Sequence, residues 1–135
     1  MKYLIYFLIV LLNCGFSCDK SCEIDYVIYN NLDEEIIVKR RSIDMVIEYQ
    51  NIPSKWNTLI YNERGRLRDV DEMMEYSLSN HPDTIEYFNE LILYKITNNN
   101  SVKSDKNYKL RQYWVFKKYD DWNGEYKLII DEDNF

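Results

Sequence analysis

Hydrophobic and polar residues alternate along most of this chain in short runs, which is the pattern of half-buried β-strands. In the run at residues 24–29, Ile24, Tyr26 and Ile28 share one face, because successive side chains of a strand point to opposite faces. The runs are rich in Ile, Val and Tyr, which suit pleated, half-buried positions. The pattern predicts strands at residues 24–29, 35–41, 43–49, 56–61, 88–96, 113–119 and 125–130.

The run at residues 43–49 alternates regularly and predicts one buried face. Ile43, Met45, Ile47 and Tyr49 fall on that face, against polar neighbours on the other. A proline follows shortly after and stops the strand, because proline cannot donate to a ladder.

One segment, at residues 69–79, breaks the alternation. Val70 and Met73 begin a set of residues that recur at three- and four-residue steps, as on one face of a helix. Asp69 or Asp71 can cap its start. We therefore expect a short helical insert at residues 69–79.

Asn, Asp and Gly residues mark the expected turns. The turn at 30–33 predicts that the first two strands pair as a hairpin, and the turn at 62–65 predicts a positive φ at Gly65. Residues 97–106 are polar and predict a loop. Asn123-Gly124 predicts a hairpin between the last two strands.

These elements predict a mainly β fold, an antiparallel two-sheet β-sandwich of the immunoglobulin-like or transthyretin-like kind. A small open barrel is the alternative. The chain divides into a signal peptide at residues 1–17, a short tether at 18–23, and a single sandwich domain at 24–135.

The start of the chain has the order of a secretory signal peptide. Lys2 precedes a continuous apolar run at residues 3–12, which is too short to span a bilayer as a helix. The run ends in GFSC, which resembles the lipobox of bacterial lipoproteins and implies lipidation of Cys18. Cys14 is the competitor, but Asn13 fits poorly at the cleavage position. A multiply acylated cysteine anchors a domain stably to a membrane.

Composition excludes several classes of partner and cofactor. The formal net charge is −6, which argues against nucleic acid and against electrostatic binding to an anionic bilayer. His81 is the only histidine, and cleavage before Cys18 leaves Cys22 as a lone thiol. Neither zinc nor a disulfide framework is therefore expected, and no cofactor is indicated.

Catalytic patterns are not apparent in the sequence. His81 precedes a proline in an expected loop, away from any nucleophile motif. Acidic groups occur together at turns and at the chain end, so solvated turn acids are favoured over a carboxylate pair or a calcium site. These groups are Asp33-Glu34-Glu35, Asp71-Glu72, Asp120-Asp121 and Asp131-Glu132-Asp133. We expect no catalytic and no metal-binding residue.

Aromatic residues supply the remaining candidates for ligand binding. Trp122 lies in an expected hairpin turn, where burial is difficult, and Trp56 and Tyr119 are the other candidates. Exposed Trp and Tyr side chains stack on sugars or anchor protein interfaces. Burial over the end of the sandwich is the competing explanation.

Three parts of the mature chain carry a resemblance to a known group: YVIYNNLDEEIIVK at residues 26–39, the Ile52-Pro53 pair and YKLIIDEDNF at residues 126–135. They resemble the small β-rich lipoproteins of Bacteroidetes, to which no activity is assigned. It implies a β-sandwich in the cell envelope, and the helical segment at 69–79 departs from it.

Together these observations predict an exported, lipid-anchored module of the cell envelope. They favour the outer membrane and do not distinguish between its two leaflets. We expect a non-enzymatic protein that binds another protein. One form is an immunity-type protein that blocks a basic toxin through Asp120 and Asp121. The alternative is a glycan-binding lipoprotein that uses Trp122 and Trp56, and a carboxylate-pair hydrolase is the least favoured hypothesis.

Overall fold

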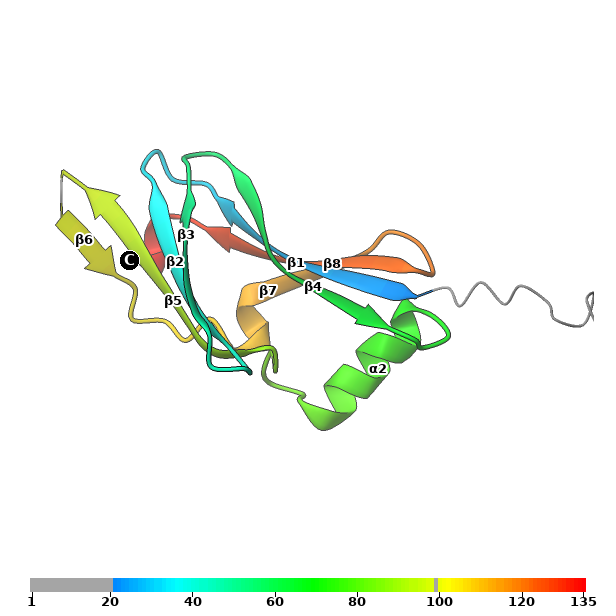
Figure 1. Cartoon of the computed structure of the whole chain (residues 1–135). Helices are drawn as coiled ribbons and strands as arrows, with labels where there is room; N and C mark the ends of the chain where they lie inside the picture. The colour runs from blue at the N-terminus through cyan, green and yellow to red at the C-terminus, as the bar shows by residue number, and fades with distance from the viewer. Residues whose placement is uncertain (1–20, 99) are drawn as a thin grey trace, which may run out of the picture.

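The computed structural model describes residues 21–98 and 100–135. Within these ranges, eight strands form two four-stranded sheets, with one α-helix at one end (Figure 1). Sheet A has the strand order β4-β1-β8-β7, and sheet B has the order β3-β2-β5-β6. The elements are β1 (Cys22–Asn30), β2 (Ile36–Ser42), β3 (Ile47–Ile52), β4 (Asn57–Gly65), α2 (Val70–Asn80), β5 (Phe88–Thr97), β6 (Asn100–Lys103), the 3-10 turn η1 (Arg111–Tyr113), β7 (Trp114–Lys118), β8 (Asn123–Ile130) and the 3-10 turn η2 (Glu132–Asn134).

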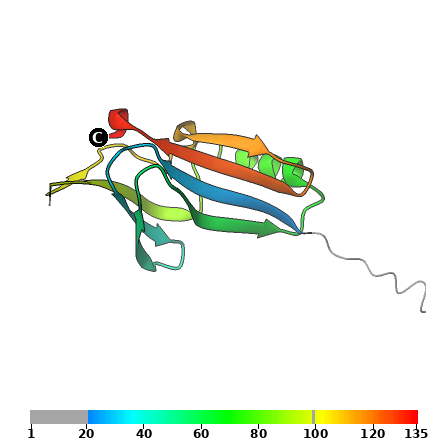
Figure 2. The same ribbon diagram turned by 90° about the horizontal axis from the view of Figure 1, so that it is seen from above.

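The inner faces of the two sheets supply the core, as the two-residue period predicts. Ile24, Tyr26 and Ile28 of β1 are almost fully buried, and so are Val38 of β2 and Leu93 of β5. The strands of sheet A run side by side above this layer (Figure 2). The predicted fold class, a mainly β two-sheet sandwich with one short helix, is confirmed.

The first two strands do not pair as the predicted hairpin. β1 belongs to sheet A and β2 to sheet B, so the turn after β1 carries the chain from one sheet to the other. The buried Asn30 stabilises this crossing, because its amide donates to the carbonyl oxygens of Glu34 (2.8 Å) and of Ile52 (3.1 Å). The polar residues at 30–33 correctly predicted a turn of the chain, but they do not determine which sheet the next strand joins.

One pair of strands is parallel. β1 lies between β4, with which it pairs antiparallel, and the last strand β8, with which it pairs in parallel. The other strand pairings of the described residues are antiparallel. The structure therefore joins the two ends of the domain in the middle of sheet A (Figure 1).

The prediction for residues 43–49 is wrong in its boundaries and in its burial. β3 begins at Ile47, and the residues before it form a tight turn in which Met45 has a φ of 64°. Ile43, Met45, Ile47 and Tyr49 are 58%, 65%, 47% and 66% exposed. Their regular alternation therefore forms an apolar face that no other described element covers. Periodicity identifies such a face but does not show whether it is buried.

The predicted turn at 62–65 is also wrong. β4 continues to Gly65, which pairs with Cys22 of β1 and does not have a positive φ. Gly65 instead allows helix α2 to approach, since a Cβ there would lie 3.0 Å from Sδ of Met73. Close packing, rather than turn geometry, explains this glycine.

The helical insert is confirmed with its predicted cap. α2 spans Val70–Asn80, and the Asp69 carboxylate accepts the amide hydrogen of Glu72 (2.9 Å) as N-cap. Val70, Met73 and Ser77 form its buried face.

Two further details of the hairpins differ from the prediction. Residues 97–106, expected as a loop, contain β6, which pairs with β5. The closing hairpin of β7 and β8 is confirmed, but Asn123 and Gly124 already belong to β8, so the turn lies before them. Gly124 faces Phe116, whose Cζ would lie 2.8 Å from an added Cβ.

Candidate functional site

The predicted lipidation sites, Cys18 and its competitor Cys14, lie outside the described residues. The first described strand starts at Cys22, within the stretch that the sequence assigns to the tether. Cys22 is buried, its thiol donates to the carbonyl oxygen of Leu67 (3.3 Å), and burial raises the pKa of the thiol. Cys22 is thus a core residue and not a reactive one.

The two candidate tryptophans lie at opposite ends of β1. The carbonyl oxygen of Trp122 accepts from the amide of Glu23 (2.7 Å), and that of Trp56 accepts from the amide of Asn30 (3.0 Å). Along an extended strand this separation is about 23 Å. Trp56 is largely exposed, whereas Trp122 is half-buried against the core. The two rings do not form one stacking platform.

The third tryptophan, Trp114, is a core residue. Its indole nitrogen donates to the carbonyl oxygen of Tyr108 at 2.8 Å.

Tyr119 shares the β7–β8 turn with Trp122 and is exposed. The Lys117 ammonium lies 4.9 Å from the centre of its ring. In the same turn, the Asp120 carboxylate accepts the amide hydrogens of Trp122 (2.7 Å) and Asn123 (2.8 Å). The side chain of Asn123 and these amides lower the pKa of Asp120. Asp120 therefore acts as a turn-holding residue.

His81 and two glutamates belong to a half-buried tyrosine cluster at the edge of sheet A. The Glu63 carboxylate accepts from the hydroxyl of Tyr26 (3.2 Å) and from that of Tyr87, and burial raises its pKa. His81 contacts the Glu86 carboxylate through Nε2. The rings of Tyr26 and Tyr87 lie 5.5 Å apart, so this cluster packs sheet A against the loop before β5.

Arg111 connects this cluster to the helix. Its guanidinium donates to Oγ of Ser77 (3.0 Å) and to the carbonyl oxygens of His81 and Thr84 (both 3.1 Å). It also donates to the hydroxyl of Tyr126. One side chain thus bonds four groups from three segments, which is a structural role.

Within residues 21–98 and 100–135, no group of three or more His, Cys, Asp or Glu side chains is arranged to hold a metal ion. In the same ranges, no helix combines the length and the apolar character needed to cross a bilayer.

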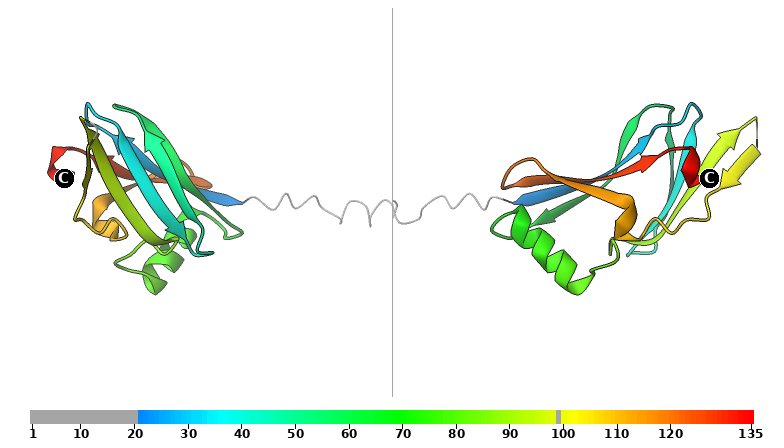
Figure 3. Two further views of the ribbon diagram at one scale, coloured as in Figure 1. Left: turned by 60° about the vertical axis from the view of Figure 1, so that its left-hand side comes forward. Right: turned by 180° about the vertical axis from the view of Figure 1, so that it is seen from behind.

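The outer face of sheet B concentrates positive charge, although the chain is acidic overall. Lys39 and Arg41 of β2 both contact the Glu90 carboxylate of β5, at 3.0 and 3.5 Å. The ion pair with Lys39 lowers the pKa of Glu90 and raises that of Lys39. Two cations thus share one anion on this face, whose strands lie in front in the left view of Figure 3.

Exposed apolar side chains lie beside these cations. Tyr49 is the cross-strand neighbour of Lys39, and Ile47 is the neighbour of Arg41. We call the five large exposed residues of the β2–β3 turn and β3 the apolar hairpin; they are Ile43, Met45, Val46, Ile47 and Tyr49.

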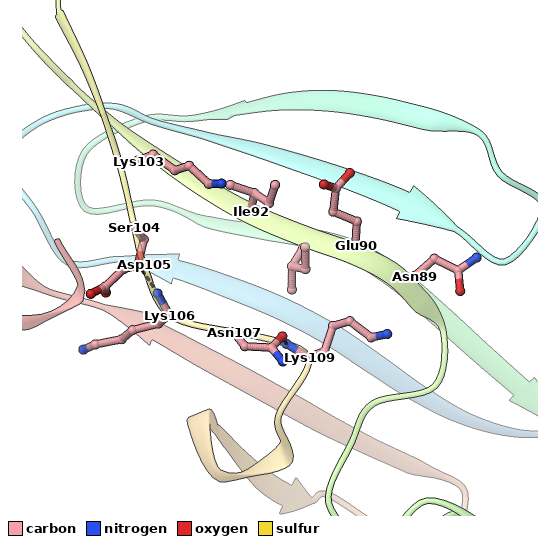
Figure 4. A pocket seen from close by; sticks show the side chains of 10 residues that line it. Asn89, Glu90, Ile92, Lys103, Ser104, Asp105, Lys106, Asn107 and Lys109 are labelled. Atoms are coloured by element: carbon pink, nitrogen blue, oxygen red, sulfur yellow. Dashed lines mark hydrogen bonds between the residues drawn. The ribbon is translucent and has the colours of Figure 1, made fainter.

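A groove with a volume of about 630 Å³ continues this surface (Figure 4). It lies between β5 and the segment that follows β6, and we call it the lysine groove. The Asn89 amide on its rim donates to the carbonyl oxygen of Ser42 (3.1 Å), the last residue of β2 before the apolar hairpin, so the groove and the hairpin adjoin. Its lining residues are Asn89, Glu90, Leu91, Ile92, Lys103, Ser104, Asp105, Lys106, Asn107 and Lys109.

The lysines of the groove outnumber the carboxylates that line it, and Lys103 is one of the cations that lower the pKa of Glu90. No described carboxylate lies within ion-pair distance of Lys103 or Lys109. Lys106 donates to the carbonyl oxygen of Asp133 near the C-terminus. With Lys39 and Arg41 included, five cations stand against the carboxylates of Glu90 and Asp105.

Sequence reasoning missed this surface. Lys103 and Lys106 lie in the segment expected to be a loop, and Lys109 follows it, so a lysine recurs at every third residue, which was the available signal. Their relation to Lys39 and Arg41 depends on the pairing of β2 with β5, which the sequence does not reveal.

No family model, no curated protein and no solved structure matches this chain.

Proposed function

We propose that this protein is a non-enzymatic binding module of the cell envelope that contacts an acidic protein partner through the outer face of sheet B. The observation that supports the proposal most is the apolar hairpin, whose five large side chains are exposed beside Lys39 and Arg41. Contiguous exposed apolar side chains with a charged rim are typical of protein interfaces.

Charge decides the kind of partner. The excess of cations in the lysine groove, with Lys39 and Arg41 beside it, favours an acidic surface, because complementary potentials steer association and like charges oppose it. A basic toxin docked on Asp120 and Asp121 is less well supported. Asp120 is engaged by its own turn, and Asp121 lies 3.2 Å from Lys118.

Export and anchoring at Cys18 are part of the proposal and rest on the sequence pattern. The intact mass of protein from a membrane fraction tests them, with Cys18→Ala as the comparison. We expect a chain that begins at Cys18 and carries added lipid mass, which the variant lacks. A chain that starts elsewhere and carries no lipid would exclude the anchor.

The binding proposal is tested by the native size of the protein after mild detergent extraction from the envelope. We expect the wild-type protein to migrate in a complex larger than its own 16.5 kDa chain. The Ile47→Ser, Tyr49→Ser double variant should be absent from that complex and migrate at the size of the single chain. The matched control replaces Val115 and Ile129, exposed apolar residues on the outer face of sheet A, with serine. Loss of the complex in the control alone would reject the proposed surface.

The alternatives have weaker support. Glycan binding stays a prediction that rests on Trp56 and Tyr119 separately, since Trp56 and Trp122 lie at opposite ends of β1. Unchanged polysaccharide binding after Trp56→Ala and Trp122→Ala would remove it. A carboxylate-pair hydrolase needs a general acid with a raised pKa. The Glu63 carboxyl has one, but its oxygens accept from the hydroxyls of Tyr26 and Tyr87 in the tyrosine cluster. In the lysine groove, Lys39 lowers the pKa of Glu90.

A further inference from the structure

β3 is an edge strand of sheet B, and its free side is exposed. Among the described residues it pairs with β2 on one side and with no strand on the other. In the left view of Figure 3, β2 lies between β5 and β3. Four consecutive residues of this edge have little cover, since Ile47, Glu48 and Tyr49 are exposed and Gln50 is half-buried; Asn51 after them is exposed again. A further strand therefore has access to β3 along most of its length.

Three residues of β3 direct their backbone groups away from the sheet. The amide of Ser42 donates to the carbonyl oxygen of Val46 (3.1 Å), so these residues form a hydrogen-bonded pair at the start of the β2–β3 ladder. Hydrogen-bonded and open pairs alternate along an antiparallel ladder. By the register of this ladder, the N–H and C=O groups of Ile47, Tyr49 and Asn51 point to the free side. Unpaired groups of this kind are templates for another strand.

The edges β4, β6 and β7 carry features that oppose such pairing. β6 has four residues and ends in Lys103, and β7 ends in Lys117 and Lys118. The register of β4 against β1 shifts between Tyr26 and Val27 of β1. Short strands, lysines and bulges are the usual protection of a sheet edge. β3 has six residues, contains neither lysine nor proline, and pairs with β2 without a register shift, so it lacks this protection.

The charges around β3 favour a neutral strand as its occupant. Glu48 is the only charged residue of β3, and its carboxylate already lies 2.6 Å from Nε of Arg40 on β2. Lys39 and Arg41 on β2 oppose a basic segment, and an acidic segment would add like charge beside Glu48. β3 is itself a strand of nearly neutral, alternating residues, so a second copy of this chain meets the requirement.

Symmetry selects the register of the second copy. A two-fold axis at Tyr49 places this residue opposite itself and places Ile47 opposite Asn51 of the second copy, so the residues with outward backbone groups meet one another. The same register places Glu48 opposite Gln50 of the second copy, so like charges do not face each other. The contact uses the same residues on both chains, as a closed dimer requires.

We propose that this protein forms a dimer in which the β3 strands of two chains pair antiparallel about Tyr49, so that the two copies of sheet B become one continuous sheet. Ile47 and Tyr49 lie beside Arg41 and Lys39 on the outer face, so the backbone pairing leaves their side chains free to contact a partner. The dimer joins the two apolar hairpins into one surface. This inference goes beyond the proposed function, because it requires only this chain.

The register is tested by disulfide cross-linking of the purified full chain in detergent. Opposite Cα atoms of a hydrogen-bonded antiparallel pair are about 5.5 Å apart, which a disulfide can span. We expect Tyr49→Cys to give a cross-linked dimer on mild oxidation that wild type does not give. The matched control is Ile47→Cys, whose two copies are offset along the strands by about 13 Å and should not cross-link. Cross-linking of Ile47→Cys in place of Tyr49→Cys would overturn this register.

The backbone pairing is tested by sedimentation of the full chain in detergent over a range of protein concentrations. Asn51→Pro removes an N–H on the free side and none from the β2 ladder, whereas Asn51→Ala keeps it. We expect the proline variant to weaken dimerisation about tenfold or more and the alanine control about threefold or less. Tyr49→Lys should weaken it as well without a change of the backbone, because two lysines would then lie opposite each other.

A pure chain that is monomeric at all concentrations would overturn the inference, and so would a dimer that survives both Asn51→Pro and Tyr49→Lys. If the pure chain is monomeric while the complex extracted from the envelope persists, the proposed function stands without this inference. If the dimer forms and the extracted complex has only the mass of two chains, the dimer stands and the acidic partner is excluded.

Discussion

The outer faces of the two sheets differ in how their charges are balanced. On sheet A, neighbouring strands pair their polar groups: Arg64 lies 3.1 Å from Glu23, and the Asn62 amide donates to Asp25 at 2.7 Å. On sheet B, Lys39 and Arg41 compete for the single carboxylate of Glu90. The same alternation of side chains thus produces a balanced face on one sheet and a cationic face on the other.

The apolar residues differ in the same way. On sheet A the exposed ones are distributed over several strands, with Leu59 on β4, Ile129 on β8 and Val115 on β7. On sheet B five of them occupy the apolar hairpin. Isolated exposed apolar side chains are normal in soluble proteins, whereas a contiguous group beside unbalanced charge indicates a contact surface.

The largest expected effect on stability comes from a substitution in the hydrophobic core that lies between the two sheets. Ile28 is fully buried between the sheets, and Ile28→Ala removes packing and leaves a cavity. We expect the free energy of unfolding to fall by about 2–5 kcal/mol, measured by denaturant titration. A change below about 1 kcal/mol would mean that the sheets do not share one packed core.

The next largest effect is the loss of stability on replacing either of two glycines of sheet A with alanine, and it should differ between the two. In Gly124→Ala the new Cβ meets the Phe116 ring at 2.8 Å, so we expect a loss of about 1–3 kcal/mol. In Gly65→Ala the nearest atom is Sδ of Met73 at 3.0 Å, in a flexible side chain that can shift. Thermal unfolding should therefore rank Gly124→Ala as the more destabilised variant, and the reverse order would contradict this packing.

A third prediction concerns the pH dependence of stability from the tyrosine cluster. Burial raises the pKa of Glu63 above its ordinary value of 4.5, so its contribution is fully present below the unfolded pKa and is lost as pH rises through the folded pKa. Glu63→Gln keeps an acceptor oxygen and removes the charge. We expect the stability of wild type relative to this variant to fall as pH rises from about 4.5. Parallel curves in denaturant titrations across pH would contradict the assignment.

The smallest expected effect on stability is on the proposed contact surface. Ile47→Ser and Tyr49→Ser remove exposed side chains, so each should change the free energy of unfolding by about 0.5 kcal/mol or less. The same range is expected for Val115→Ser on sheet A. A large loss of stability from Tyr49→Ser would show that the apolar hairpin supports the fold and is not kept for binding.

Local patterns predicted the elements well because each depends on nearby residues. The period of two placed Ile24, Tyr26 and Ile28 in the core, and the three- and four-residue spacing with Asp69 as cap predicted α2. The partners of the strands were not predictable, because alternation marks a buried face and does not identify a neighbour. The parallel pairing of β1 with β8 is the most important feature of the fold that alternation could not predict.

The candidate site was predicted poorly for the same reason. Trp56, Tyr119 and Trp122 were selected by residue type, and the fold places Trp56 and Trp122 at opposite ends of β1. The cationic face depends on the pairing of β2 with β5, which brings Lys39 and Arg41 beside the lysine groove. An acidic total charge concealed this local excess.

The most direct test of the central claim is site-specific photocrosslinking in intact envelopes. A photoreactive amino acid replaces Tyr49 on sheet B or, in a separate strain, Val115 on sheet A; these side chains are 66% and 62% exposed. We expect a discrete adduct of higher mass from position 49 and none from position 115. An adduct from position 115 alone, or equal adducts from both positions, would contradict a contact surface on sheet B.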